Sequence, residues 1–435
     1  MLESSIRSIN IISSNLCEGG LMLPKEEKGN YPETTNSKSY RYALAPTSQF
    51  YFCGIPFRFD TAPKCPLNCS YCFAMSRGGR RTSSILLVNP SRIQRKIDRL
   101  FDSPGIKRDI NDEMLLSRMP IHFGGMSDPF ASPDISNRSL QILDTFNQID
   151  YPIVISTKNT RFLTLDKNLD RISRNKNLVI QISFSIVHER YAKEIEPCVP
   201  SPIERIKAIN YLAKQGHNIF VRIQPLFPNY IEEIKNQLIP SLGEAGVKHI
   251  TLEFLKLPVE KNLGRSKDLF ISLDWDGMRF YNEMHAEIIG REWLLPTKLK
   301  WDLLQPLIEQ IHKYGMTYGA GDYGLNHLGD TDCCCGVDII EGFSNWSKNN
   351  FSNWIRNNRT NVIMLSESVR YSLPSQSIKM YINSHSRIDE GNSIFDYLKS
   401  KWNRPGTVNA PDSYLGIEWK GDFDGKGNCV YIRSN

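Results

Sequence analysis

The chain has 435 residues, of which 40% are hydrophobic and 23% are charged, a composition typical of globular proteins. Its net charge of +6 is a mild bias, which permits an anionic partner without requiring one. No run approaches roughly 18 uninterrupted apolar residues, and the first residues lack the basic and apolar parts of a signal peptide. We therefore expect no membrane span and a cytoplasmic protein.

Residues 1–48 mix Gly, Pro, Ser, Asn and charged side chains without periodicity, and we interpret them as an N-terminal extension. From about residue 50, short runs rich in β-branched and aromatic residues alternate with helical segments, most of them spaced like βα units. Consecutive βα units predict parallel strands. The expected strands are Phe50–Phe59, Pro120–Phe123, Pro152–Thr157, Leu178–Ile186, Asn218–Leu226, His249–Leu255 and Met316–Asp322.

The expected helices begin at recognisable caps. Asn89 precedes a proline at a first helical position, and Ser201 forms a capping box with Glu204. Later helices are expected over Asp276–Ile289 and Leu299–Tyr314. The helix after Ser201 is expected to bury Ile203, Ile206, Ile209 and Leu212.

Two expected strands are apolar on one face and polar on the other. The polar faces hold Gln181, Ser183 and Ser185 in one strand, and Arg222 and Gln224 in another. A parallel sheet covered by helices leaves no face on water, so we expect these side chains to point into a barrel lumen that holds a ligand. The alternative is an open sheet with one half-exposed face.

These elements predict an α/β fold: a partial (β/α)6-type TIM barrel over residues 49–335 with a C-terminal cap region over residues 336–435. The last region loses the βα rhythm and is rich in aromatic residues. Such residues either stack on bases or, more commonly, form the core of a small domain. The residues concerned are Trp346, Trp354, Trp402, Tyr414 and Trp419.

Six of the ten cysteines fall into two clusters, which in a reducing compartment indicates metal ligands or reactive thiols rather than disulfides. The first cluster, Cys65-x3-Cys69-x2-Cys72, directly follows the first expected strand. Three thiolates at this spacing can hold three irons of a [4Fe–4S] cluster and leave one iron open to an exchangeable ligand. A zinc site completed by a distant histidine is the alternative, although zinc sites are usually built from paired elements.

This motif, with the aromatic Tyr71 before its third cysteine, resembles the signature of the radical S-adenosylmethionine superfamily. The resemblance implies a [4Fe–4S] cluster whose open iron binds S-adenosylmethionine (SAM). It also implies reductive cleavage of SAM to a 5′-deoxyadenosyl radical, which abstracts hydrogen from a substrate. An electron donor such as a flavodoxin or a ferredoxin would then be a partner.

Further segments resemble the spore photoproduct lyase-like branch of that superfamily, whose members are often labelled DNA repair photolyases. These segments are His122–Asp128, Ile155–Lys158, Phe184–Ile186, Glu196 with the following proline, and Val221–Pro225. The resemblance implies that Lys158 and Ser185 hold the SAM carboxylate, and that Gly124 and Gly125 let the backbone approach the SAM amino group. The candidate SAM-binding residues are Tyr71, Gly124, Gly125, Lys158, Ser185, Arg222 and Gln224.

The resemblance fails at one position. In spore photoproduct lyase this segment carries a cysteine that returns a hydrogen atom to the product radical. Aligned on Ser127 and Asp128, that cysteine falls on Gly125, which has no thiol. The barrel and the cofactors remain expected, whereas thymine-dimer splitting by that mechanism does not.

The second cluster is three consecutive cysteines, Cys333, Cys334 and Cys335, after the last expected strand and therefore expected at the catalytic rim. One interpretation is an auxiliary iron–sulfur cluster, although neighbouring side chains diverge in an extended backbone. A second is a catalytic thiol over the barrel mouth, which donates hydrogen or holds the substrate. The third is packing as small buried hydrophobes.

The expected function is that of a radical SAM enzyme which repairs or modifies a nucleic acid. The basic loop Arg77–Arg81 is either a grip for phosphates or a solvated loop. His122 and His249 are expected to be satisfied interior histidines, and Glu253 to face the lumen as an anchor for a ribose hydroxyl or the substrate. The alternatives are a peptide- or protein-modifying radical SAM enzyme with an auxiliary cluster, and a non-enzymatic iron–sulfur sensor that binds nucleic acid.

Overall fold

The computed structural model describes residues 34–35, 40, 43–47, 49, 53–76, 85–102, 110–259, 263–343, 346, 351–357, 360–365, 394–407 and 409–434. The basic loop Arg77–Arg81 lies outside these residues. By its contacts the chain from Pro32 to Asn435 forms one compact unit. Within the described ranges, no helix has both the length and the apolar character that a membrane crossing requires.

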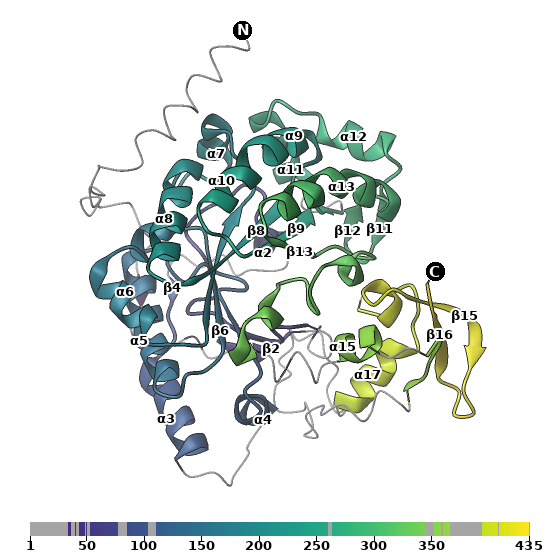
Figure 1. The fold of residues 1–435 in the computed structure, drawn as a ribbon, viewed down its shortest axis with the longest axis horizontal. Coiled ribbons are helices and arrows are strands. Elements are labelled where there is room, and N and C mark those ends of the chain that lie inside the picture. Colours follow the sequence, from purple (N-terminus) through teal and green to yellow (C-terminus); the bar gives the residue numbers. More distant parts are fainter. Residues whose placement is uncertain are drawn as a thin grey trace. The chain divides into compact units, whose positions relative to one another are not determined.

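An eight-stranded sheet forms the centre of this unit, in the order β13-β9-β8-β7-β6-β5-β3-β2 (Figure 1). All of its pairings are parallel except that of β2 with β3, and the end strands β13 and β2 are not joined, so the sheet is a partial barrel. The expected fold class is confirmed, with β13 as an added parallel strand. The strands are β2 (Leu44–Pro46), β3 (Phe57–Phe59), β5 (Ile121–Phe123), β6 (Ile153–Thr157), β7 (Leu178–Phe184), β8 (Asn218–Leu226), β9 (His249–Phe254) and β13 (Thr317–Ala320).

Helices cover the outer face of the sheet (Figure 1). Asn89 caps α3 through its side chain, and Ser201 and Glu204 form the expected capping box at the start of α8. The main helices are α3 (Pro90–Phe101), α5 (Pro133–Asn147), α6 (Asp166–Ser173), α8 (Pro202–Lys214), α10 (Ile239–Glu244) and α13 (Thr297–Lys313). Shorter elements are β1 (Thr34–Thr35), β4 (Ile85–Leu86), β10 (Leu257–Pro258), α2 (Phe73–Ser76), α4 (Ile110–Leu116), α7 (Glu189–Ile195), α9 (Ile231–Glu233) and α11 (Leu263–Ser272).

One expected helix is shorter than its pattern. Over Asp276–Ile289 the helix α12 (Gly277–Glu283) ends early, and β11 (Glu287–Ile289) pairs antiparallel with β12 (Glu292–Leu294). His285 adopts a left-handed φ of 52°, and the next amide donates to the carbonyl of Tyr281 at 2.9 Å. This is a Schellman ending, which the sequence conceals because histidine stands where glycine is usual.

The inner face of the sheet is polar in its middle and apolar near the amino-terminal ends of the strands. Gln181 and Thr251 are fully buried on this face, so the half-exposed open sheet is not what forms. Below them lies a small apolar cluster. It consists of Ile55, Val154, Val179, Phe220, Cys333, Cys335, Val337 and Phe343.

The segment after β13 folds back into the lumen and closes this end. The carbonyl oxygen of Cys334 accepts hydrogen bonds from His249 Nε2 at 3.1 Å and from Thr251 Oγ1 at 2.8 Å, both on the inner face of β9. The three consecutive cysteines therefore lie on the lumen floor, and their expected position at the rim is wrong. The reason is that these two hydrogen bonds hold the Cys334 carbonyl against β9, and Gly336, which has a left-handed backbone, turns the chain directly after the cysteines beside the His249 ring.

The C-terminal region adds the antiparallel sheet β14-β16-β15 and two helices. Trp402 is fully buried and meets Tyr431 edge-on at 5.1 Å, as expected for a small core rather than a stacking surface. Tyr414 reaches the barrel, where its hydroxyl accepts a hydrogen bond from Gln49 at 2.9 Å. The elements are β14 (Val362–Ile363), β15 (Ile417–Phe423), β16 (Cys429–Arg433), α15 (Phe351–Asn357) and α17 (Ile394–Trp402).

Replacing Gly336 by alanine tests how tightly the segment after β13 packs against His249 in the lumen. A Cβ atom there would lie 2.4 Å from the His249 ring, whereas one at Gly406, which is also left-handed, would meet nothing within 4 Å. Gly406→Ala should cost about 1–2 kcal/mol of unfolding free energy for its backbone alone. Gly336→Ala should cost about 1–3 kcal/mol more because of overpacking. Equal denaturation midpoints for the two variants would contradict this assignment.

Candidate active site

The three-cysteine loop lies between β3 and α2, at the carboxyl ends of the parallel strands. Cys65, Cys69 and Cys72 form no disulfide in the structure. Burial raises the pKa of Cys69 to about 12, and it raises the pKa of Cys65 although the amides of Leu67 and Asp128 donate toward that thiol. The thiols of Cys65 and Cys69 are therefore neutral without metal, and a bound metal would deprotonate them.

The three cysteines of this loop are candidate ligands for a cluster of several irons. In the described part of the chain, no three or more His, Cys, Asp or Glu side chains are placed to hold one metal ion. The ligands of a cubane bind different irons and therefore stand farther apart than the ligands of one zinc ion. Amides aimed at a cysteine sulfur, as at Cys65, are also typical of iron–sulfur sites.

The carboxylate of Glu196 gathers four side chains beside the cysteine loop. Its Oε1 accepts from Ser185 Oγ at 2.8 Å and from the Tyr71 hydroxyl, and it lies 2.9 Å from Lys158 Nζ. Its Oε2 accepts from Arg205 Nη2 at 2.7 Å. The structure thus brings together Tyr71, Lys158 and Ser185, three of the residues that the sequence nominated, around a carboxylate of the protein itself.

The charges of this group keep Glu196 ionised. Burial alone would raise the pKa of Glu196, but Arg205 and Lys158 hold it at about 2, so Glu196 is ionised. Two cations then face the one carboxylate of Glu196, and the nearby carboxylate of Asp128 also interacts with Lys158. Lys158 Nζ also lies over the Tyr71 ring, 5.4 Å from its centroid.

The Gly124–Gly125 turn follows β5. Gly124 has a φ of 102°, and a Cβ atom there would lie 2.5 Å from the Ser156 carbonyl oxygen. A Cβ atom on Gly125 would lie 2.9 Å from Arg58 Cγ. Asp60 holds the turn, since its Oδ1 accepts from the two amides after Gly125 at 2.8 and 3.2 Å. Packing within the protein therefore requires both glycines, in addition to the close backbone approach that the sequence predicted.

Asp128 fixes the backbone that carries Lys158. Its carboxylate accepts from the Lys158 amide at 2.6 Å, from Thr157 Oγ1 at 2.8 Å and from the Phe130 amide at 2.8 Å. These bonds tie the loop after β5 to the end of β6. The position of the Lys158 side chain therefore depends on Asp128.

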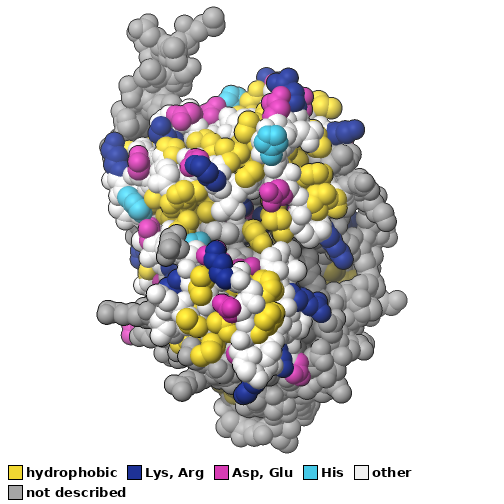
Figure 2. Space-filling view, turned by 90° about the vertical axis from the view of Figure 1, so that its right-hand side faces the viewer, with side chains coloured by type: hydrophobic (Ala, Val, Ile, Leu, Met, Phe, Trp, Pro, Cys, Tyr) yellow, Lys and Arg dark blue, Asp and Glu magenta, His cyan; other side chains and the backbone are white. Residues whose placement is uncertain are grey.

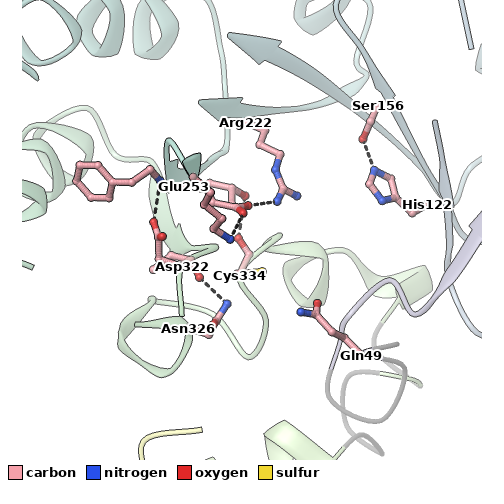
Figure 3. Close-up of polar contacts among 12 residues, drawn as sticks. Gln49, His122, Ser156, Arg222, Glu253, Asp322, Asn326 and Cys334 are labelled. Carbon is pink, nitrogen blue, oxygen red and sulfur yellow. Dashed lines mark hydrogen bonds and ion pairs between the residues drawn. The ribbon is translucent and has the colours of Figure 1, made fainter. Parts of the chain in front are cut away.

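A second charged group lies around Glu253, on the inner face of the sheet (Figure 3). Glu253 lies between Arg222 Nη2 at 2.5 Å and Lys256 Nζ at 2.6 Å. Burial would raise the pKa of Glu253, but Lys256 and Arg222 hold it at about 2. Glu253 faces the lumen as expected, and it pairs with cations there. Gln224 follows Arg222 on the same face and is half-buried.

The three consecutive cysteines do not point the same way. Cys333 Sγ and Cys335 Sγ are 3.3 Å apart within the apolar cluster of the lumen floor. Cys334 points to the opposite side, toward Arg222 and Glu253 (Figure 3). Burial raises the pKa of Cys334 to about 11, against a lowering by Arg222. The three sulfur atoms do not converge on one cluster, and we do not propose an auxiliary cluster here.

Both interior histidines have hydrogen-bond partners, as expected. His122 Nε2 lies 2.7 Å from Ser156 Oγ, which donates to Gln181 Oε1 at 2.9 Å (Figure 3). Burial, followed by the charges of Arg222 and Arg58, lowers the pKa of His122 to about 3. This histidine is therefore neutral at physiological pH and carries its proton on Nε2.

Sequence reasoning missed Arg205, the deepest cation of the site. It lies on the buried face of α8 with Ala208, Ile209 and Leu212, whereas Ile203 is 39% exposed. The spacing of Arg205 from those apolar residues was a usable signal. A charged residue among apolar positions at helical spacing indicates a buried partner.

Comparisons with known proteins give distant similarities. No model of a known protein family matches the chain. The chain is 27% identical over 167 residues to an uncharacterized protein, ORF301, of Acidianus two-tailed virus, which is 37% of this chain and 52% of that protein. The chain thus spans about half the length of the curated relative that it matches.

Several solved structures are similar at low identity. A spore photoproduct lyase variant has a TM-score of 0.48 at 15% identity, covering 63% of this chain and 78% of that one. Spore photoproduct lyase complexed with dinucleoside spore photoproduct has a TM-score of 0.45 at 15% identity, covering 60% and 74%. SuiB of Streptococcus suis bound to S-adenosylmethionine has a TM-score of 0.34 at 14% identity, covering 71% and 69%.

Removal of the Arg205 side-chain charge should destabilise the fold, because Glu196 would remain buried and ionised with one cation fewer beside it. We expect Arg205→Met to lower the free energy of unfolding by about 3–5 kcal/mol. Arg161→Met is the control, since Arg161 and Glu204 form an exposed pair at 3.5 Å, and it should cost no more than about 1 kcal/mol. Adding Glu196→Gln to Arg205→Met should recover part of the loss. Denaturant titration that gives equal losses for the two arginine variants would contradict the role of Arg205.

Proposed function

We propose that this chain is a radical SAM enzyme, with a [4Fe–4S] cluster held by Cys65, Cys69 and Cys72 and SAM bound beside it. The observation that carries the proposal is the convergence of Tyr71, Lys158 and Ser185 next to the cysteine loop. These residues come from three separate segments of the chain. The resemblance of the sequence motifs to radical SAM enzymes implies, independently of these contacts, that the same residues bind SAM.

The residues around Glu196 have distinct roles in this proposal. A bound cluster and SAM supply reductive cleavage of the SAM sulfonium and, through it, hydrogen abstraction from the substrate. Lys158 keeps donors beyond the one aimed at Glu196, so it can also bind the SAM carboxylate. Arg205 anchors Glu196, and Glu196 in turn orients Lys158 and Ser185. The electron would come from a flavodoxin or a ferredoxin.

For the substrate we propose a nucleic acid, which the enzyme repairs or modifies. The motif resemblance and the net charge of +6 support this choice. Figure 2 shows one face of the molecule, on which described basic, acidic and hydrophobic side chains are interspersed rather than gathered into a basic surface. Recognition through the polar lumen is therefore favoured over recognition by that outer face. Because Gly125 replaces the lyase cysteine, the proposal does not include thymine-dimer splitting by that thiol.

The cluster assignment predicts that Cys69→Ala abolishes SAM cleavage, because the cluster would lose one of three protein ligands. The measurement is 5′-deoxyadenosine formed by the anaerobically reconstituted protein with a reductant, together with its iron content. Cys198→Ala is the matched control, since Cys198 is an exposed free cysteine. Pools of DNA, RNA and peptides added to the wild type then identify the substrate class. Full activity in Cys69→Ala would refute the assignment.

If Lys158 binds the carboxylate of SAM, Lys158→Met should weaken SAM binding without loss of iron. A charge-assisted hydrogen bond contributes about 1.5–3 kcal/mol, which corresponds to a roughly ten- to hundred-fold weaker affinity. Equilibrium binding of SAM to the reconstituted protein measures it. Lys298→Met is the control, because Lys298 is an exposed lysine on α13. Unchanged affinity in Lys158→Met would mean that the lysine serves Glu196 alone.

A further inference from the structure

We propose that the lumen contains an oxyanion-binding subsite beside Cys334, formed by Arg222 and Gln181, which receives a singly charged anionic group of the substrate. The assignment to a substrate rests on the proposed function, whereas the binding of an anion does not. The sequence nominated Arg222 as a candidate SAM-binding residue, but Arg222 pairs with Glu253 and, among the described residues, has no contact with the group around Glu196 that is proposed to hold SAM. The argument has three steps: the charge of the lumen, its unpartnered donors and the thiol beside them.

The charged side chains of the lumen carry one positive charge in excess. Arg222 and Lys256 share the single carboxylate of Glu253, at 2.5 and 2.6 Å. Lys300 and Asp322, both almost fully buried, lie 3.5 Å apart and add no net charge whether or not the proton moves between them. A surplus cation in a buried site is stabilised by an anion, because water screens it poorly there.

Neighbouring charges do not cancel this surplus. Arg58 pairs with Asp60 at 2.9 Å, so this pair is neutral overall. His122 faces the same lumen from β5 and is uncharged, because its pKa is about 3. Among the described residues of the lumen, Glu253 is the one carboxylate that forms ion pairs with Arg222 and Lys256. An anionic ligand would therefore balance the second positive charge.

Two buried donors in the lumen lack acceptors. Gln181 is fully buried, and its Oε1 accepts from Ser156, but its Nε2 has no hydrogen-bond partner among the described residues. The Nε of Arg222 also has none in that part of the chain. A buried N–H group without an acceptor costs about 1–3 kcal/mol, which a ligand oxygen would offset.

The two donors are neighbours on the inner face of adjacent strands. In the register of β7 and β8, Gln181 stands opposite Phe220, and Arg222 stands two residues further along β8. Side chains two residues apart on a strand share a face, so Gln181 and Arg222 line the same surface. A cation with an adjacent neutral donor is complementary to an oxyanion, which has several acceptor lone pairs.

Cys334 places a thiol near Arg222. Its side chain points toward Arg222 and Glu253, away from the apolar cluster that holds Cys333 and Cys335 (Figure 3). An anionic group on Arg222 would therefore bring the adjoining atoms of its ligand near a neutral thiol. Two sources have the required chemistry: the phosphodiester of a nucleic acid, which agrees with the proposed substrate, and a carboxylate of a peptide.

The thiol allows a direct test with two alkylating reagents that differ in charge. Iodoacetate carries a carboxylate, and iodoacetamide is its neutral counterpart. In both reactions the thiolate sulfur displaces iodide and forms a carbon–sulfur bond. The full-length reconstituted protein is treated without SAM at mildly alkaline pH, and peptide mass spectrometry gives the rates at Cys334 and at Cys198. Cys198 is the internal control, because it is exposed and outside the lumen.

For each cysteine, the measured quantity is the alkylation rate with iodoacetate divided by the rate with iodoacetamide. If the subsite exists, this ratio should be about ten-fold higher at Cys334 than at Cys198. The iodoacetate rate at Cys334 should also level off as the iodoacetate concentration is raised. Lys256→Gln removes the surplus charge and should bring the ratio down to the Cys198 value. Gln181→Glu, which preserves size but adds a negative charge, should do the same and covers the case in which Lys256→Gln fails to fold. A wild-type ratio equal to that of Cys198 would overturn the proposal. So would a Cys334 that neither reagent reaches after Cys198 has reacted completely.

Competition distinguishes the two sources of the anion. Dimethyl phosphate should slow the iodoacetate reaction at Cys334 if the subsite takes a phosphodiester, and acetate should do so if it takes a carboxylate. Protection by neither anion would overturn the proposal. None of these measurements requires SAM cleavage, so a failed subsite and a failed radical SAM assignment give different results.

Discussion

The buried carboxylate of Glu196 is the constraint on which the candidate site depends. An ionised carboxylate that leaves water must be paired, and here Arg205 from α8 and Lys158 from the end of β6 supply the charges. Ser185 and Tyr71 supply the remaining hydrogen bonds. One carboxylate thereby fixes the loops after β3, β6 and β7 against a helix. The same contacts position the cysteine loop, because Tyr71 lies within that loop and donates to Glu196.

The sheet creates a second constraint, because polar side chains on its inner face cannot reach bulk water. The lumen satisfies them in two ways: a neutral chain from His122 through Ser156 to Gln181, and the ion pairs of Glu253. Below these groups the apolar cluster excludes water from the amino-terminal ends of the strands. The polar layer is therefore bounded on one side by the apolar cluster and on the other by the loops that meet at Glu196.

Local patterns in the sequence were sufficient for the parallel strands β5 to β9 and β13, for the α8 capping box and for the polar inner face, because each depends on neighbouring residues. They did not predict the antiparallel strand β2, and the expected strand Phe50–Phe59 is shorter in the structure, where β3 covers Phe57–Phe59. The pairing of Glu196 with Arg205 was not predictable, since it depends on how α8 rotates against β7. The same limit applies to the three cysteines. Their alternation predicts that Cys334 opposes its neighbours, but their position on the lumen floor depends on contacts with His249 and Thr251, which are distant in the sequence. His285 ended α12 without the glycine that usually indicates such an ending.

The two charged groups of the barrel have the same composition, because each places two cations around one carboxylate. Lys158 and Arg205 both pair with Glu196, and Arg222 and Lys256 both pair with Glu253. In both, an internal carboxylate keeps buried cations charged and oriented, so that they are preorganised when a ligand arrives. Without Glu196 or Glu253, the cations would repel each other and lose their fixed geometry. Each carboxylate is therefore a structural requirement for binding an anion, although its own charge opposes that anion.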